Sequence, residues 1–222
     1  MRQKFRDRTE AGKLLAAKLT AYSHHDDVLV LALPRGGVPV GYEVAKQLNA
    51  PLGICLVRKL GVPEHRELAM GAISMGKVRV INQNVVDLLS ISPATIDSVA
   101  ATEQLELNRR YQLYQGDRPL PKIQNKTIIL VDDGIATGAT IKAAIATIKQ
   151  QQPRELIVAV PVAGISTCEE LAREVDQVVC VLMVENLYAI GIWYEDFAQT
   201  TDTEVRSLLT KSMQHHHNVI YN

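Results

Sequence analysis

Short apolar runs alternate with helical patterns along most of the chain. These runs are rich in valine, leucine and isoleucine, and they lack the regular polar alternation of a strand with one solvated face. They lie at residues 28–32, 52–57, 78–81, 127–131, 156–162 and 178–183. Between several of them, apolar residues recur at the three- and four-residue spacing typical of helices. Near-continuous apolar strands separated by helices predict an α/β fold, with a parallel sheet flanked by helices on both faces.

Two segments depart from this alternation. In the first, at about residues 82–126, Ser92 and Pro93 suit the N-cap and first turn of a helix. Its expected apolar face is formed by Ile96, Val99, Ala100, Leu107, Tyr111 and Tyr114. The second, at about 185–222, carries much of the aromatic content. We expect one domain spanning residues 1–222, with a core at about 28–184 and a small hood built from the helical insertion and the C-terminal region.

Composition narrows the class of protein. A chain of 222 residues, 47% of them hydrophobic, can bury a substantial core. Lys+Arg and Asp+Glu both number 24, so any anion site must be local, and we expect neither a nucleic-acid nor a membrane partner. The widely spaced Cys55, Cys168 and Cys180 suit reduced thiols. No apolar stretch reaches membrane-spanning length and the start does not resemble a signal peptide, which predicts a cytoplasmic location.

The stretch VDDGIATGAT, residues 131–140, carries the main chemical signal. Asp132 and Asp133 follow a predicted strand, and ligands of parallel sheets bind beyond the carboxyl ends of the strands. A loop of small residues then leads into a helical pattern. Backbone N–H groups at such a loop, together with the helix dipole, favour an anion. The stretch therefore predicts a phosphate-binding loop with two acids at its rim.

Several other readings of this stretch can be compared. Gly138 is followed by alanine, which excludes a Gly-Lys-Ser/Thr phosphate loop, and the Gly-x-Gly-x-x-Gly dinucleotide pattern is absent. A phosphoacceptor receiver domain also ends an apolar strand in acids, but such a domain begins with that strand, whereas here more than half of the chain precedes it. A tight turn whose acids merely cap a helix stays open on these residues alone.

Residues 131–140 resemble the signature of the type I phosphoribosyltransferases, which bind 5-phosphoribosyl-1-pyrophosphate (PRPP). The shared features are an apolar strand, two acids, two mostly apolar positions and then Ala/Asp-Thr-Gly-x-Thr. The resemblance implies that Asp132 and Asp133 face the ribose hydroxyls and hold Mg²⁺ through water or those hydroxyls. It also implies that the 5′-phosphate is bound by Gly134, Ile135, Ala136, Thr137, Gly138, Ala139 and Thr140.

Two further loops fit the family in the correct order. The turn at residues 33–37 resembles the family's pyrophosphate loop, and Arg58-Lys59 resembles the basic pair that adenine and orotate phosphoribosyltransferases place before a flexible closing loop. The implied pyrophosphate ligands are Arg35, Gly36, Gly37, Arg58 and Lys59. The implied closing loop is residues 60–75, including His65 and Arg66. Taken singly, a plain strand-to-helix turn and a solvated basic pair would explain these segments.

The resemblance implies transfer of the phosphoribosyl group from Mg-PRPP to a purine- or pyrimidine-like base, with release of pyrophosphate. Asp132, Asp133, Arg58 and Lys59 would be the catalytic groups, because negative charge builds on the departing pyrophosphate and positive charge on the ribose. The alternative is a PRPP-sensing regulator or binding module without turnover. The basic pair favours the enzyme, and no DNA-binding helix pair is recognisable. Family members are often dimers, so a homodimer is compatible with the resemblance.

Signals about the acceptor conflict. Ala136 stands where hypoxanthine-guanine phosphoribosyltransferases carry an aspartate, which argues against that subclass. Yet residues 188–195 resemble the base-stacking segment of those enzymes, which implies acceptor contacts from Tyr188, Trp193 and Glu195. Core or interface aromatics are the alternative, and the acceptor stays open.

The two ends of the chain are less informative. The start at Phe5–Arg8 is either a solvated charge cluster or a source of an arginine across the active-site mouth. Together with residues 33–37 and 193–197 it resembles a group of predicted bacterial phosphoribosyltransferases of unassigned acceptor. The histidines at 215–217 suit a solvated terminus, and no role is assigned to either end.

Overall fold

The structure is a computed structural model that describes residues 4–63, 65–76, 78–116 and 118–220. The chain divides into two compact units. The first comprises Met1–Cys55, Pro121–Gly138 and Gln152–Asn222, and the second comprises Leu56–Leu120 and Ala139–Gln151. Whether the two units act as the single domain expected from the sequence stays a prediction.

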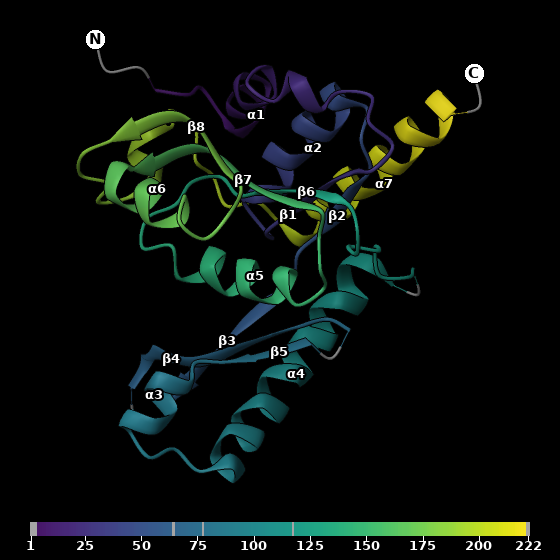
Figure 1. The fold of residues 1–222 in the computed structure, drawn as a ribbon. Helices are drawn as coiled ribbons and strands as arrows, with labels where there is room; N and C mark the ends of the chain where they lie inside the picture. The colour runs from purple at the N-terminus through teal and green to yellow at the C-terminus, as the bar shows by residue number, and fades with distance from the viewer. Residues whose placement is uncertain (1–3, 64, 77, 117, 221–222) are drawn as a thin grey trace. The chain divides into compact units, whose positions relative to one another are not determined.

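The first unit is built around a five-stranded sheet in the order β2-β1-β6-β7-β8, in which every neighbouring pair is parallel. Its strands are β1 (Val28–Ala32), β2 (Leu52–Ile54), β6 (Thr127–Val131), β7 (Glu155–Gly164) and β8 (Gln177–Val184). Its helices are α1 (Arg8–Ala17), η1 (Thr20–Tyr22), α2 (Gly37–Leu48), α6 (Ile165–Leu171), η2 (Ile190–Trp193) and α7 (Asp202–Ile220). The predicted α/β fold with a parallel sheet is confirmed (Figure 1).

One face of this sheet forms a core with α1 and α2. Alternate strand residues point to the same face, and those of β1, β6 and β7 join side chains from both helices. The buried members of this core are Leu15, Ala16, Leu19, Val28, Val30, Val40, Val44, Ala45, Leu48, Ala50, Ile129, Val131, Ile157, Ala159 and Val179. Burial of each large aliphatic side chain contributes about 1.5–3 kcal/mol. This packing fixes the positions of the strand ends that carry the site.

Strand register brings two loops of the first unit together. Ala32, the last residue of β1, lies beside Val131, the last residue of β6. The Leu33 backbone N–H donates to the Val131 carbonyl oxygen at 2.9 Å, so the pairing extends one residue beyond β1. The loops that follow β1 and β6 therefore start side by side, although about a hundred residues separate them in the sequence.

The second unit contains a three-stranded antiparallel sheet in the order β3-β4-β5. Its elements are β3 (Val57–Val62), β4 (His65–Ser74), β5 (Val78–Ile81), α3 (Gln83–Leu88), α4 (Pro93–Gln115) and α5 (Ala139–Lys149). The expectation that residues 78–81 form a strand of the parallel sheet is wrong. No residue of β5 is fully buried, as befits an antiparallel sheet with one solvated face. The excursion from the parallel sheet also starts earlier than the predicted helical insertion, at Leu56, and begins with strands.

Residues 60–75 were expected to be a polar loop, but they form most of a β-hairpin. Strands β3 and β4 pair in an antiparallel manner, with register shifts on either side of Gly61. Leu60, Val62 and Met70 are buried. Charged residues between these apolar positions concealed the strand pattern in the sequence. A closing motion of this segment stays a prediction.

The helix that follows Ser92 agrees with the sequence. The Ser92 hydroxyl accepts the Thr95 backbone N–H at 3.1 Å, and α4 begins at Pro93. Ile96, Leu107 and Tyr114 of its predicted apolar face are buried.

His215, expected in a solvated terminus, lies on α7, while the side chains of His216 and His217 lie outside the described residues. Across the described residues, no helix combines the length and apolar character needed to cross a membrane.

Candidate active site

The two acids lie directly after β6, at the carboxyl end of the parallel sheet. The Asp133 backbone N–H donates to Oδ1 of Asp132 at 2.9 Å, which links the two residues. Next along the chain, the Ile135 backbone N–H donates to the Val162 carbonyl oxygen of β7 at 2.9 Å. The acid pair is thus held between two strands of a buried sheet, and only 8% of Asp133 is exposed.

The loop at residues 33–37 packs directly against this acid pair. A Cβ atom at Gly36 would lie 2.0 Å from Oδ2 of Asp133, and one at Gly37 would lie 2.9 Å from the Asp132 Cα. Glycine is therefore the residue that this close approach permits. Helix α2 begins at Gly37, and the peptide bond between Pro34 and Arg35 is cis. The structure brings these predicted pyrophosphate-binding glycines and the predicted ribose-facing acids to one edge of the sheet.

Small residues also shape the loop that continues from the acids. A Cβ atom at Gly134 would lie 2.7 Å from Cγ2 of Ile190, so a side chain there would displace Ile190. Gly138 has a φ of 73°, in the left-handed region that favours glycine. The Thr167 hydroxyl of α6 donates to the Ala136 carbonyl oxygen at 3.4 Å. Thr137 and Thr140 are exposed, and Ala139 begins α5. Backbone N–H groups and hydroxyls in such a loop suit a phosphate.

An arginine that sequence reasoning left unassigned lies on the acid pair. Arg8 Nε donates to Oδ2 of Asp133 at 2.8 Å, and Arg8 Nη1 donates to the Ala198 carbonyl oxygen at 2.7 Å. The Arg8 guanidinium also lies over the Phe197 ring, 3.9 Å from its centroid. The sequence offered this arginine only as one of two readings of Phe5–Arg8. Its partner, Asp133, became visible only when the fold brought these two distant parts of the chain together.

A second missed residue is Tyr194. Its hydroxyl donates to the Asp133 carbonyl oxygen at 2.6 Å, and only 3% of the residue is exposed. The sequence had instead singled out its neighbours Trp193 and Glu195. The strongest available signal was the dense aromatic segment at 193–197, which marked the region and not the individual residue.

Burial dominates the electrostatics of the acid pair. Loss of solvent raises the pKa of Asp132 well above its ordinary value, and the nearby charge of Asp133 adds to that effect. Burial also raises the pKa of Asp133, while the Arg8 guanidinium opposes this rise. Two buried carboxylates that share one positive partner are stabilised by a further cation or by hydroxyl donors. The arrangement therefore suits a polyhydroxylated, metal-associated ligand.

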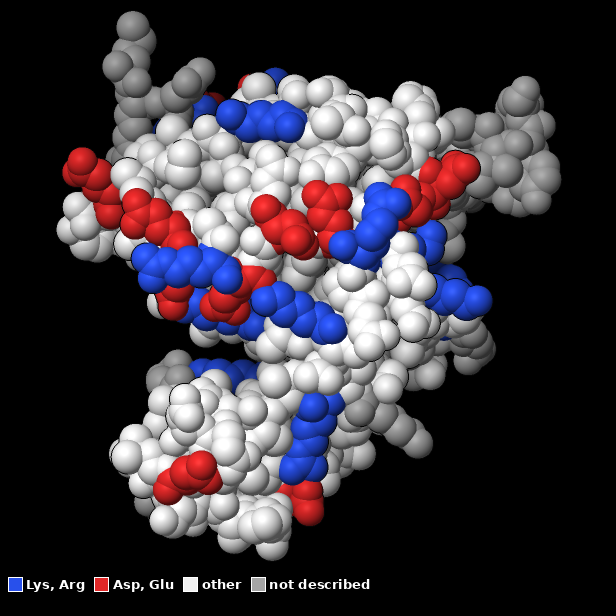
Figure 2. Space-filling view, in the orientation of Figure 1, with Lys and Arg blue, Asp and Glu red and all other residues white. Residues whose placement is uncertain are grey.

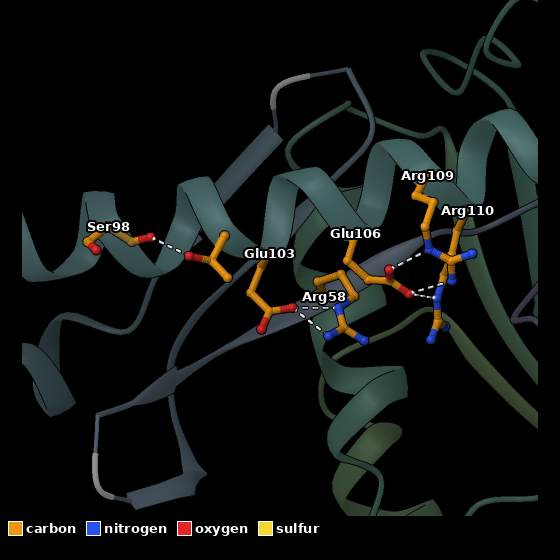
Figure 3. A network of polar contacts seen from close by, with 7 residues as sticks. Arg58, Ser98, Glu103, Glu106, Arg109 and Arg110 are labelled. Carbon is orange, nitrogen blue, oxygen red and sulfur yellow. Dashed lines mark hydrogen bonds and ion pairs between the residues drawn. The ribbon is translucent and has the colours of Figure 1, made fainter.

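The predicted basic pair lies in the second unit, within β3 and not at a strand end as expected. Arg58 Nε donates to Oε2 of Glu103 on α4 at 2.6 Å (Figure 3). One turn further along α4, Glu106 accepts from Arg109 and Arg110. Arg58 and Lys59 are both half-buried. The guanidinium of Arg58 is thus already oriented by a carboxylate from its own unit.

The other predicted residues have diverse environments. Arg35 is partly exposed and makes a long ion pair, 3.8 Å, with Asp202 of α7. His65 is exposed at the start of β4, and the Arg66 side chain lies outside the described residues. Acidic and basic side chains are interspersed on the face shown in Figure 2.

The predicted acceptor contacts all follow β8 in the chain, and they differ in exposure. Tyr188 is 86% exposed, whereas Trp193 packs with the cluster of Phe5 and Tyr194. Glu195 is exposed, and its backbone N–H donates to the Phe5 carbonyl oxygen at 2.8 Å. The substrate roles of the predicted site residues stay predictions.

Comparison with known proteins places the chain in a family. A sequence profile described as the phosphoribosyl transferase domain matches residues 7–188. Two curated relatives from Mycobacterium tuberculosis, strains H37Rv and CDC 1551, provisionally named phosphoribosyl transferases Rv0571c and MT0597, are each 41% identical over 208 residues. That alignment covers 94% of this chain and 47% of each relative, so the chain spans about half the length of the curated relatives it matches.

A solved structure shares the whole fold. The crystal structure of TT1426 from Thermus thermophilus is 36% identical to the chain, with a TM-score of 0.86, and the match covers 94% of this chain and 98% of that chain. The chain therefore belongs to the phosphoribosyl transferase family, with the type I fold that its sequence predicted. The family match begins at Asp7 and so includes Arg8, which the sequence had left outside the core.

Proposed function

We propose that the protein transfers the 5-phosphoribosyl group from Mg-PRPP to a nitrogenous, purine- or pyrimidine-like acceptor and releases pyrophosphate. One observation carries the proposal. Gly36, of the candidate pyrophosphate loop, packs against the carboxylate of Asp133, of the candidate ribose-binding pair. The candidate loop for the 5′-phosphate, residues 134–140, continues directly from the same acids. A ligand whose ribose carries a phosphate at one end and a pyrophosphate at the other therefore matches this arrangement.

Each part of PRPP has candidate partners in this proposal. The loop from Gly134 to Thr140 binds the 5′-phosphate through backbone N–H groups and threonine hydroxyls. Asp132 and Asp133 accept the ribose hydroxyls and offset the positive charge that develops on the ring. The pyrophosphate is bound by Arg35, Gly36, Gly37, Arg58 and Lys59. Charges placed where the transition state needs them supply the catalysis, and no protein nucleophile is required.

Magnesium fits the acid pair. Carboxylate oxygens are preferred Mg²⁺ ligands, and the ion usually keeps several waters and binds substrate phosphates as well. Burial and mutual repulsion raise the pKa of Asp132, and a bound cation relieves both effects. Asp132 and Asp133 would hold the ion directly, through water or through ribose hydroxyls. When bound, Mg²⁺ neutralises charge on the departing pyrophosphate.

The experiment has two stages. Calorimetry with PRPP and Mg²⁺ first measures binding, and a screen of nitrogenous bases then measures acceptor-dependent pyrophosphate release. Ala136 favours an adenine-like acceptor over a 6-oxopurine, so adenine and pyrimidine bases head the screen. We expect Asp133→Asn to lower release at least about 100-fold, because a preorganised charge facing the ribose is lost.

The matched control is Asp26→Asn, which changes an exposed aspartate on the loop before β1. We expect release to equal that of the native protein in this variant. Release that is unchanged by Asp133→Asn would contradict the proposal. PRPP binding without release for any acceptor would support the PRPP-sensing alternative instead.

A further inference from the structure

Two segments that are far apart in the sequence pair with each other beside the acid pair. Residues 5–8, here called the N-terminal strap, run beside residues 193–198, here called the C-terminal segment. The Phe5 N–H donates to the Trp193 carbonyl at 2.9 Å, and the Asp196 N–H donates to the Arg6 carbonyl at 2.9 Å. The Tyr194 ring lies between Phe5 and Phe197, at centroid distances of 5.3 and 4.9 Å. Backbone hydrogen bonds and aromatic packing together hold the N-terminal strap in a defined position.

The strap places Arg8 with little freedom. Its guanidinium is bound by the Asp133 carboxylate, the Ala198 carbonyl and the face of the Phe197 ring. Only 12% of the Arg8 side chain is exposed. By contrast, 66% of the Arg6 side chain is exposed, and its ion-pair partner is the adjacent Asp7. Two arginines on the same strap therefore differ completely in environment, and only Arg8 contacts the candidate site.

Contacts from these segments converge on one residue. Arg8 binds Oδ2 of Asp133, while the Tyr194 hydroxyl binds the carbonyl oxygen of the same aspartate. The carboxylate is consequently held in one orientation by a side-chain partner, and its backbone is held by a second partner. Residues that orient a functional carboxylate commonly affect activity nearly as strongly as the carboxylate itself.

We propose that Arg8 is a positioning residue of the phosphoribosyl transfer, which fixes the Asp133 carboxylate toward the ribose of PRPP through the N-terminal strap. The inference rests on the proposed function. A purely structural role, in which Arg8 only fastens the strap, predicts loss of stability without loss of PRPP affinity in the folded protein. A positioning role predicts that affinity falls even where folding is complete.

The test measures PRPP affinity by calorimetry in the presence of Mg²⁺ for the native protein, Arg8→Ala, Arg8→Lys and the matched control Arg6→Ala. Circular dichroism selects a temperature at which each variant is folded. We expect Arg8→Ala to weaken binding by at least about tenfold. Arg8→Lys keeps the charge but loses the planar fork of donors, so its affinity should lie between those of the native protein and Arg8→Ala. Arg6→Ala should bind as the native protein does.

Chemical rescue separates positioning from fastening. Methylguanidine at millimolar concentration should restore part of the PRPP affinity of Arg8→Ala, since it supplies the missing guanidinium without reconnecting it to the strap. If Arg8→Ala does not fold, the comparison of Arg8→Lys with Arg6→Ala tests the same claim. Native affinity in Arg8→Ala, or in Arg8→Lys when the alanine variant does not fold, would overturn the inference and leave the proposed function intact. A native protein that binds no PRPP would overturn both.

Discussion

The acid pair of the first unit and the basic pair of the second unit are built in contrasting ways. Asp133 is 8% exposed and is surrounded by Gly36, Arg8 and Tyr194, which come from three distant parts of the chain. Arg58 lies on a hairpin with irregular register, is half-buried, and has a carboxylate partner on the adjacent α4. The first is fixed by packing on several sides, and the second is oriented by one ion pair.

This contrast has a physical consequence. A buried carboxylate held by several partners is preorganised, so binding a ribose there requires little reorganisation. A partly exposed ion pair contributes little to stability and can exchange its partner at small cost. We therefore expect changes around Asp133 to affect both folding and binding, and changes around Arg58 to affect binding alone.

The largest expected effect comes from adding a methyl group at Gly36, which packs against the Asp133 carboxylate. In Gly36→Ala the new methyl group would lie 2.0 Å from Oδ2 of Asp133. The φ of Gly36, −61°, suits any residue, so the cost arises from the clash and not from backbone strain. We expect the free energy of unfolding to fall by about 2–3 kcal/mol and PRPP binding to be lost. Denaturant unfolding and calorimetry measure the two effects.

Gly164→Ala is the matched control for this substitution. A Cβ atom there would meet its nearest neighbour, the Thr167 hydroxyl, at an ordinary contact distance of 3.5 Å. We expect a change in stability within about 0.5 kcal/mol. Equal effects of the two alanines would show that the packing of Gly36 against Asp133 is unimportant.

The second-largest expected effect is a change in PRPP affinity when the basic pair, Arg58 and Lys59, is altered. Arg58→Ala should lower PRPP affinity by about 10- to 100-fold, because hydrogen bonds from a charged donor are lost, with little change in unfolding. Glu103→Gln should tighten PRPP binding a few-fold, since the guanidinium no longer has a charged partner within its unit. Glu106→Gln is the control, because Glu106 pairs with Arg109 and Arg110. Native affinity in Arg58→Ala would remove this residue from the proposed site.

The smallest effect is on the pH dependence of stability, where an acid from each unit should behave oppositely. Burial raises the pKa of Asp132, so its contribution to stability is complete below its unfolded pKa and is lost as the pH rises through the folded value. Hydrogen bonds from Arg109 and Arg110 lower the pKa of Glu106 to about 2. The contribution of Glu106 to stability is present above its unfolded pKa and is lost as the pH falls through its folded pKa of about 2.

Two substitutions test this difference. Asp132→Asn should raise the free energy of unfolding by about 1 kcal/mol at neutral pH and by less under acidic conditions, while it weakens PRPP binding. Glu106→Gln should slightly lower stability at neutral pH and leave it unchanged in strong acid. Urea unfolding across the pH range measures both. A destabilising Asp132→Asn at neutral pH would show that the buried charge is already compensated within the chain.

Local patterns explain how much could be predicted from the sequence. Strands β1, β6, β7 and β8 are continuous apolar runs, and the small-residue loop after Asp133 has an order of residues found in one family. The loop at 33–37 also follows directly from a strand and leads into a helix. Such features depend on neighbouring residues, so the parallel sheet and the edge that carries the acid pair were both predictable.

The remaining features depend on contacts between distant residues. Arg8 and Asp133 lie 125 positions apart, and Tyr194 and Asp133 lie 61 apart. No local pattern in a single sequence reveals such pairs. The hairpin of β3 and β4 was missed for another reason, because charges interrupt its apolar positions and a register shift at Gly61 breaks the alternation.

The most direct test of the central claim is a crystal structure of the protein with PRPP and Mg²⁺. The account predicts the 5′-phosphate within about 3 Å of backbone N–H groups in the loop at 134–140, with the ribose hydroxyls facing Asp132 and Asp133. A sugar phosphate bound elsewhere, or a complex that does not form at millimolar PRPP, would contradict it.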